Sequence, residues 1–205
     1  MPPRPDVSEQ RTAQIIEAAI AVFSEKGFDG ATMDDIAGRI GINKATIYLY
    51  FDSKDALIRA IAEDIFAREL TDLQSARDMP AAAAERLTAF YEALIDDDAE
   101  LLPLMPILYE FYALGLRRDD VRAVLSGFIR RSAGLLEAII RDGIASGEFA
   151  PTDARAAALA LDALISGTTL HWVYAPDEVD INAQLRFAVR LVLRALASDD
   201  AGPGG

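Results

Sequence analysis

The sequence contains no cysteine and a single histidine, His171. The absence of cysteine excludes disulfide bonds, thiolate nucleophiles and cysteine-ligated zinc sites, and one histidine cannot build a multi-histidine metal centre. The chain also lacks a glycine-rich phosphate-binding loop. These absences remove much of enzyme chemistry, so we expect no catalytic site, no bound metal and no cofactor.

Long uninterrupted apolar runs are also missing. The longest apolar stretch, LLPLMPILYEFYALGL from residue 101, contains two prolines and Glu110. A helix that spans a bilayer needs about 20 apolar residues, and the opening segment MPPRPDVSEQR lacks the apolar part of a signal peptide. These features predict a cytoplasmic protein that is neither secreted nor inserted into a membrane.

Basic residues are scarce, with 20 Lys and Arg against 33 Asp and Glu and a net charge of −13. Residues 1–54 hold six basic and eight acidic residues, whereas residues 55–205 hold 14 and 25. The three lysines, Lys26, Lys44 and Lys54, all lie in the first part. A strongly acidic chain repels polyanions, which argues against indiscriminate nucleic-acid binding. The uneven distribution indicates that the two parts can face different partners.

Helical signals run through the whole chain. Ser, Thr, Asp or Asn opens apolar runs of period 3.6, Gly or Pro closes them, and no clear alternating strand interrupts them. We therefore predict an all-α fold of about nine helices. They are expected near residues 9–26, 33–40, 44–51, 54–77, 80–96, 102–117, 120–146, 152–174 and 180–197.

Residues 33–52 are predicted to form two short helices that meet at a tight turn. A small residue, Ala37, lies where the helices touch, and Gly41 four residues later can adopt the positive φ that the turn needs. Ile36 and Ile47 supply the inner apolar faces. This spacing indicates a helix-turn-helix. Such helix pairs also arise by chance in all-α proteins, so the spacing alone leaves DNA binding and coincidence equally open.

The outward face of the second short helix favours DNA. If Ile47 points inward, five residues are left largely exposed: Lys44, Ala45, Thr46, Tyr48 and Leu49. A tyrosine hydroxyl and a lysine can bind phosphate oxygens, while Ala, Thr and Leu offer methyl groups to thymine. Alternatively, Tyr48 and Tyr50 simply cover the core with their hydroxyls in water. We favour DNA contact for Tyr48 and weigh both roles equally for Tyr50.

The segment TMDDIAGRIGINKATIYLYFDSKDAL, preceded by IIEAAIAVFSEKGFDG, resembles the N-terminal DNA-binding domain of the tetracycline-repressor (TetR) family of bacterial transcription regulators. The resemblance covers residues 11–60. It implies a homodimer that binds a palindromic operator in double-stranded DNA and is released by a small, largely apolar ligand. We expect a helix-turn-helix domain over residues 1–53, a helical ligand-binding and dimerisation domain over 54–198, and a disordered tail over 199–205.

Site residues follow from the resemblance position by position. It places contacts to bases or to the groove at Lys44, Ala45, Thr46, Tyr48 and Leu49, and phosphate contacts at Thr32, Asn43, Tyr50 and Lys54. Lys54 also stands at the start of the fourth helix, where the helix dipole favours an anion.

Two positions depart from the family pattern. The position of Leu49 is often histidine, and Asp34 is acidic where some relatives place a basic residue. A leucine cannot hydrogen-bond to a phosphate or a base edge, so we expect specificity to rest more on Thr46, Lys44 and methyl contacts. Asp34 can disfavour some DNA sequences by repulsion.

The last helix, INAQLRFAVRLVLRALA, has two apolar faces. One apolar face is formed by Leu185, Ala188, Val189, Val192 and Leu196, and another by Phe187 and Leu191. One face suits the core of the subunit, and the other needs a partner, for which a second chain is the economical choice. The preceding helix is rich in alanine, which permits close helix approach, so two such helices per chain suit a four-helix dimer interface. The alternative is a large monomer core. We assign dimerisation to Leu164, Leu185, Ala188, Val189, Val192 and Leu196.

Aromatic residues and methionine gather around the two prolines of the apolar stretch. Flexible and aromatic groups with a few polar tips suit an apolar ligand pocket, yet the same stripe can be ordinary core. His171 can bind a ligand or be a buried histidine with its hydrogen bonds satisfied, and we favour the second. The candidate ligand residues are Met105, Tyr109, Tyr112, Phe128, His171 and Trp172.

These features together predict a ligand-responsive transcription regulator, and a repressor in particular. Two alternatives remain: an all-α enzyme or ligand carrier with an incidental helix-turn-helix, and a module that uses Tyr48 and Tyr50 to bind protein.

Overall fold

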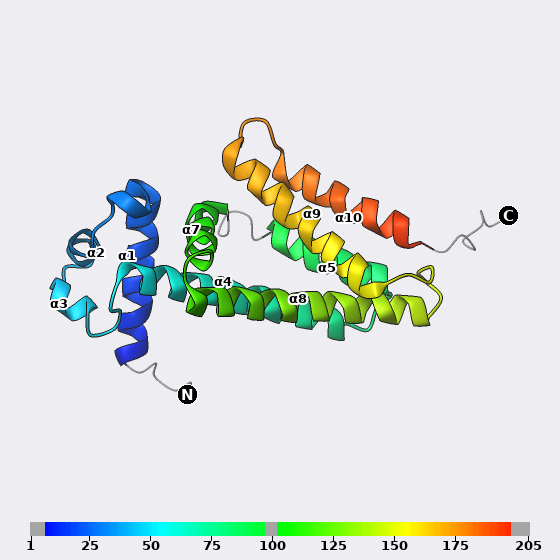
Figure 1. Cartoon of the computed structure of the whole chain (residues 1–205), viewed down its shortest axis with the longest axis horizontal. Coiled ribbons are helices and arrows are strands. Elements are labelled where there is room, and N and C mark those ends of the chain that lie inside the picture. Colours follow the sequence, from blue (N-terminus) through cyan, green and yellow to red (C-terminus); the bar gives the residue numbers. More distant parts are fainter. Residues whose placement is uncertain (1–6, 97–101, 198–205) are drawn as a thin grey trace. The chain divides into compact units, whose positions relative to one another are not determined.

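The computed structural model describes residues 7–96 and 102–197, and these residues are helical almost throughout (Figure 1). The predicted all-α fold is confirmed, with nine α-helices in the described part of the chain. The predicted tail, residues 199–205, lies outside it. In order, the helices are α1 (Val7–Gly30), α2 (Met33–Arg39), α3 (Lys44–Ile47), α4 (Lys54–Asp78), α5 (Ala83–Asp96), the 3₁₀ helix η1 (Leu102–Leu104), α7 (Met105–Gly115), α8 (Asp119–Ala145), α9 (Ala154–Tyr174) and α10 (Ile181–Leu196).

Packing divides the described chain into two compact units. Residues 7–66 and 102–125 form the first unit, and residues 67–96 and 126–197 form the second. The helices α4 and α8 each contribute to both. These units reflect packing, whereas the predicted boundary at residue 53 is functional and stays a prediction.

The first unit packs α1 against α2, α7 and η1, and α2 against α3. Its interior is built from fully buried apolar side chains of α1, α2, α3 and α4, and Phe66 contacts Phe111 of α7 with ring centroids 6.1 Å apart. Arg118, at the turn between α7 and α8, holds the start of α4 through an ion pair to Asp55 of 2.9 Å. Burial and this pair together position the start of α4 beside α7.

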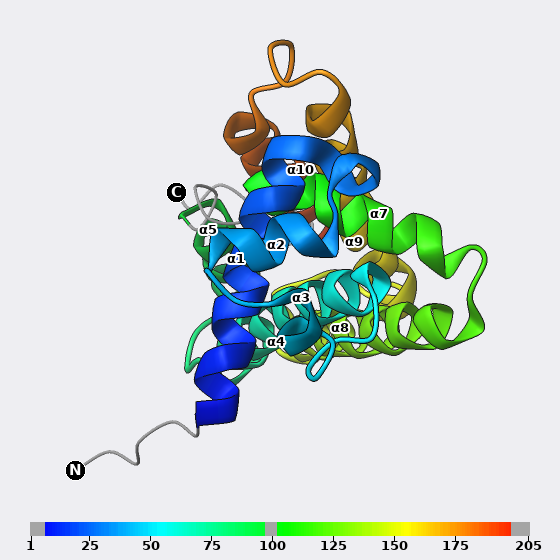
Figure 2. The ribbon, with the colours of Figure 1, turned by 90° about the vertical axis from the view of Figure 1, so that its left-hand side faces the viewer.

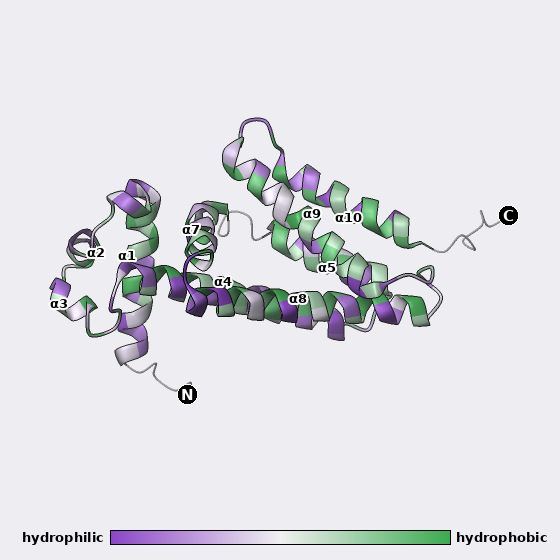
Figure 3. Cartoon of the chain, in the orientation of Figure 1, coloured by the Kyte–Doolittle hydropathy of each residue, from purple (hydrophilic) through white to green (hydrophobic). Residues whose placement is uncertain are grey.

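The second unit buries one continuous core contributed by α4, α5, α8, α9 and α10. Its fully buried members include Leu73, Leu87, Leu136, Ile139 and Ile140. A bidentate ion pair between Arg186 of α10 and Glu92 of α5 reinforces the packing of these two helices. Hydrophobic residues recur along all five helices (Figure 3).

The segment GIASGEF, residues 143–149, closes one end of this core. Glu148 accepts hydrogen bonds from the backbone N–H groups of Ala83 and Ala84, at 2.7 and 2.8 Å, and so caps the start of α5. Phe149 is buried, and Gly147 has a φ of 80°, which glycine adopts without strain. The segment therefore joins the end of α8 to the start of α5.

Candidate nucleic-acid interface

The turn between α2 and α3 has the predicted construction (Figure 2). Thr32 and Asp35 form a reciprocal capping box at the start of α2, and the Asn43 side chain accepts a hydrogen bond from the backbone N–H of Ala45 at 2.8 Å. Gly41 has a φ of 66°, in the left-handed region that the prediction required. The predicted helix-turn-helix is therefore confirmed at the level of backbone and caps.

The second short helix is a single α-helical turn that continues as tight turns. The regular part of α3 ends at Ile47, and residues 48–51 continue through backbone hydrogen bonds such as Tyr50 N–H to Ile47 O at 2.9 Å. The prediction extended this helix to residue 51. Aromatic and β-branched residues disfavour a longer helix, so the regular ladder stops early.

Side chains of this segment divide between the core and water. Ile47 and Phe51 are buried, as predicted, while Tyr48 is 44% exposed and Leu49 is 82% exposed. Asn43 and Ala45 are exposed, and Lys44, Thr46 and Tyr50 are half-buried. Tyr48 and Leu49, directly after the last residue of α3, therefore form a short exposed ridge, which we call the ridge of α3.

Two lysines of the first unit, Lys26 and Lys44, are paired with carboxylates. The ammonium of Lys44 of α3 donates to the carboxylate of Asp34 of α2 at 2.9 Å, and this hydrogen bond is the main cause that raises the pKa of Lys44. Lys26 binds Asp35 at 2.5 Å. That hydrogen bond, followed by those from Thr32, lowers the pKa of Asp35 to about 2. The positive charges of Lys26 and Lys44 are thus compensated by carboxylates of the protein itself.

Two predicted phosphate contacts have structural roles. The ammonium of Lys54 donates to the carbonyl oxygens of Phe28 and Ala31, at 2.8 and 2.7 Å, and lies 4.5 Å from the centre of the Phe28 ring. The hydroxyl of Thr32 donates to Asp35 and accepts from its backbone N–H. Phosphate binding by these two residues stays a prediction.

Comparison with known proteins identifies the family. The description of bacterial regulatory proteins of the tetR family matches residues 15–61, and that of the C-terminal domain of BetI-type transcriptional repressors matches residues 80–197. The chain belongs to the TetR family. It is 30% identical to the transcriptional regulator BetI of Burkholderia mallei (strain NCTC 10229) over 203 residues, which cover 95% of this chain and 98% of that protein.

Solved structures share the TetR fold. A putative transcriptional regulator from Pseudomonas aeruginosa PAO1 is 27% identical, with a TM-score of 0.75, and the match covers 93% of this chain and 92% of that one. SmeT, the repressor of a Stenotrophomonas maltophilia multidrug efflux pump, is 21% identical with a TM-score of 0.73 and coverage of 92% and 91%, and it supports the fold alone. The protein is therefore a helix-turn-helix transcription regulator of a family without enzymatic activity.

The candidate ligand residues of this TetR-family chain fall in both compact units. In the first unit, Met105 is buried and the half-buried rings of Tyr109 and Tyr112 meet at 5.5 Å between centroids. In the second, Phe128 is buried, Trp172 is half-buried and His171 is exposed. The expectation of a buried His171 is wrong, because this residue lies on the outward side of α9. A ligand role for the six residues stays a prediction.

A cluster of half-buried acidic groups near the buried Tyr91 of the second unit was missed by sequence reasoning. Burial, followed by the charges of Asp162 and Asp72, raises the pKa of Glu69 to about 7. Burial, followed by the charges of Asp162 and Glu69, also raises the pKa of Tyr91. The signal available was Asp162, which interrupts the apolar run ALALDALI of α9.

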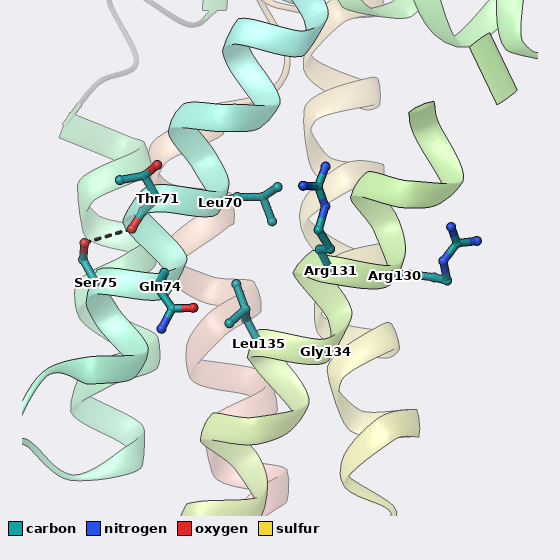
Figure 4. A pocket seen from close by; sticks show the side chains of 8 residues that line it. All are labelled: Leu70, Thr71, Gln74, Ser75, Arg130, Arg131, Gly134 and Leu135. Atoms are coloured by element: carbon teal, nitrogen blue, oxygen red, sulfur yellow. Dashed lines mark hydrogen bonds between the residues drawn. The ribbon is translucent and has the colours of Figure 1, made fainter. Parts of the chain in front are cut away.

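A surface groove of about 590 Å³ runs between α4 and α8 in the second unit (Figure 4). Leu70 and Leu135 give it an apolar part, and Arg131 rises beside Leu70 from the opposite helix. The Arg131 side chain donates to the Gly127 carbonyl through Nε at 3.4 Å. The groove can accept an apolar group together with an anionic one. Its other lining residues are Thr71, Gln74, Ser75, Arg130 and Gly134.

The predicted dimerisation residues differ in exposure. Leu185, Ala188, Val189 and Leu196 are buried within the subunit itself, where α10 packs on α5 and α9, and Val192 is half-buried against the same core. Leu164 of α9 is exposed. A role of the six residues in dimerisation stays a prediction.

Large apolar side chains are exposed on α9 and α10, beside exposed polar residues such as Gln184, Arg190 and Arg194. Among the described helices, α9 alone has the length and apolar composition of a membrane span, and it pairs with α10. Phe187 and Leu191, one turn apart on α10, are about half exposed. We call the exposed apolar residues of the two helices the outward stripe. It consists of Leu159, Leu164, Leu170, Tyr174, Phe187 and Leu191.

Proposed function

We propose that the protein is a cytoplasmic repressor that binds a palindromic operator as a homodimer and releases it when a small ligand binds. The single observation that carries the DNA-binding part is the outward ridge of α3. Tyr48 and Leu49 are exposed there, while the buried Ile47 and Phe51 hold the helix against its unit. A short helix that presents an aromatic ring and an apolar side chain to solvent suits the major groove better than water.

The homodimer is supported by the outward stripe. A subunit that exposes six large apolar side chains on two neighbouring helices needs a partner for them. A second copy supplies the same stripe by two-fold symmetry, which gives a four-helix interface. In such a dimer the two α3 segments would enter successive major grooves, roughly 34–36 Å apart.

Ligand release is supported by relatives of the same fold. SmeT has been solved in complex with triclosan, and FadR of Bacillus subtilis in complex with stearoyl-CoA. The groove between α4 and α8 and the six candidate ligand residues are the sites we propose for a ligand here. A ligand changes DNA affinity only if it binds the DNA-competent and DNA-incompetent states unequally. Release of the band-shift complex by an added ligand tests this part.

A band-shift assay with the DNA upstream of the protein's own gene tests DNA recognition. We expect Leu49→Ala to weaken operator binding several-fold, because apolar contacts with thymine methyl groups are lost. Leu116→Ala is the matched control, since Leu116 is 81% exposed and Leu49 is 82% exposed. Equal effects of the two changes, or no DNA binding by the wild type, would reject the proposal.

A further inference from the structure

Three basic residues near the ridge of α3 each have a carboxylate partner in the same unit. Lys26 binds Asp35, Arg39 binds Glu25 through both oxygens at 2.7 and 2.9 Å, and Lys44 binds Asp34. The pairs of Lys26 and Arg39 join α1 to α2, whereas the pair of Lys44 joins α2 to α3. Lys44 is therefore the cation of α3 itself, and Asp34 is its counter-charge.

Asp34 differs from its neighbour Asp35 in what it does for the fold. Asp35 accepts from the backbone N–H and hydroxyl of Thr32 and completes the cap of α2. In the part of the chain that the structure describes, Lys44 is the only side chain that binds Asp34. The carboxylate is also largely exposed. Asp34 thus contributes little to helix capping, and its main contact is with a residue expected to face DNA.

We propose that Asp34 is an intramolecular competitor of DNA phosphate for the ammonium of Lys44, and that it lowers the affinity of the protein for all DNA. The proposal rests on the proposed function, because it requires α3 to face DNA. When DNA binds, Lys44 either leaves Asp34 or shares its charge between Asp34 and a phosphate. In both cases the attraction between Lys44 and Asp34 offsets part of the attraction between Lys44 and a phosphate.

The pairing of Lys44 with Asp34 would help the protein to distinguish operator DNA from random DNA. Binding to random DNA depends on neutralised phosphates, whereas operator binding also gains from base contacts. A helix whose cation is already compensated binds random DNA weakly. Recognition then depends more on the uncharged side chains of Thr46, Tyr48 and Leu49, which supply methyl, hydroxyl and aromatic contacts.

The strength of the pair sets the size of the effect. Exposed ion pairs of this kind contribute about 0.2–1 kcal/mol, which corresponds to a factor of about 1.4–5 in affinity per subunit. The pair is thus weak enough for DNA to open. Each fully neutralised phosphate steepens the slope of log K against log salt by about 0.9, so release of Lys44 in both subunits would steepen it by about 2.

Asp34→Asn tests the proposal, because asparagine keeps the size of the side chain and removes its charge. The probes are a random-sequence duplex long enough for one dimer and the DNA upstream of the protein's own gene, each titrated at several salt concentrations. We expect affinity for the random duplex to rise about 2–25-fold for the dimer, with a slope steeper by about 2. Asp177→Asn is the charge-matched control, since Asp177 is exposed in the loop between α9 and α10.

The double variant with Lys44→Ala separates competition from plain repulsion. If Asp34 acts through Lys44, Asp34→Asn adds little affinity once Lys44 is alanine. An undiminished gain in that background would overturn the proposal, as would an equal gain from Asp177→Asn or an unchanged salt slope. Unaltered circular dichroism and thermal unfolding of Asp34→Asn show that the fold is kept. Failure of the wild type to bind either DNA would instead reject the proposed function.

Discussion

Lys54 is a residue whose structural contacts change its interpretation. The family resemblance predicts a phosphate contact, yet its ammonium donates to two carbonyl oxygens at the end of α1 and lies over the Phe28 ring. Those carbonyls are part-buried and lose their partner if the ammonium is removed. The residue therefore joins the start of α4 to the turn before α2, whatever its role on DNA.

We expect Lys54→Met to lower the free energy of unfolding by about 1.5–3 kcal/mol, because a charged hydrogen-bond donor to part-buried carbonyls is lost. Urea unfolding followed by circular dichroism measures this loss. The matched control is Lys26→Met, which breaks an exposed ion pair and should cost less than about 1 kcal/mol. Equal losses for the two variants would contradict the structural role of Lys54.

The raised pKa of Glu69 leads us to expect that the stability of the protein depends on pH. This pKa is raised to about 7 in the folded protein from an ordinary value of 4.5, so between these values the folded state binds more protons than the unfolded state. Stability therefore falls as the pH rises through this window, and below it no penalty remains. After burial, the charges of Asp162 of α9 and Asp72 of α4 are the further causes of this raised pKa.

We expect Glu69→Gln to raise stability at pH 8 by about 1–3 kcal/mol and to change it little at pH 4. Urea unfolding of both proteins across this pH range measures the difference. Asp142→Asn is not a suitable control, because Asp142 binds the buried Arg86. Glu63→Gln, in an exposed pair with Arg59 on α4, is suitable and should show no such trend. A parallel pH profile for Glu69→Gln and wild type would contradict the assignment.

Within the helix α8, Gly143 has no room for a side chain, whereas Gly134 has. A Cβ at Gly143 would lie 2.4 Å from a ring carbon of the buried Phe149 and 2.8 Å from the Ala83 Cβ, whereas a Cβ at Gly134 would meet nothing within 4 Å. Gly143 therefore permits the close packing of α8 on the segment that follows it. Gly134 has no comparable packing requirement within the subunit.

We expect Gly143→Ala to destabilise the protein by about 1–3 kcal/mol, because the added methyl group overpacks a rigid ring. Gly134→Ala should instead stabilise it by about 0.5–1 kcal/mol, since alanine favours a helix over glycine. Thermal or urea unfolding of the two variants checks both signs. A stabilising Gly143→Ala would show that Phe149 can move aside and that the contact does not constrain α8.

For the whole molecule, oligomeric state depends on which face of α10 is left uncovered. The subunit buries Leu185, Val189 and Leu196 in its own core and exposes Phe187 and Leu191. The Arg186 guanidinium, between these faces, is held by Glu92. The dimer that we propose would use the outward stripe, which the packing of α10 on α5 and α9 leaves uncovered.

We expect Phe187→Glu to convert the dimer to a monomer, because a charge would be placed in the apolar interface without a partner. Sedimentation equilibrium measures the mass, and the band-shift assay should show weaker operator binding by the monomer. The matched control is Ile129→Glu, since Ile129 of α8 is 47% exposed and Phe187 is 51% exposed. A dimeric Phe187→Glu protein, or a monomeric wild type, would reject this interface.

Local signals in the sequence are enough to predict the all-α fold and the helix-turn-helix. The cap of Thr32 and Asp35, the positive φ of Gly41 and the inward positions of Ile47 and Phe51 depend on neighbours within a few residues, so spacing reveals them. The early end of α3 shows the limit of such signals, because boundaries depend on small differences in free energy.

Contacts between distant residues were decided by the tertiary structure alone. The binding of Lys54 to carbonyls more than 20 residues away, the pairing of Lys44 with Asp34, the acidic group around Glu69 and the exposure of His171 all depend on which helix faces pack together. The sequence shows two apolar faces on α10. Burial of an apolar face is favourable whether a neighbouring helix or a second subunit covers it, so the sequence cannot distinguish these two cases. Packing against α5 and α9 covers one face and leaves Phe187 and Leu191 outside, so only the tertiary structure shows which face the subunit covers itself.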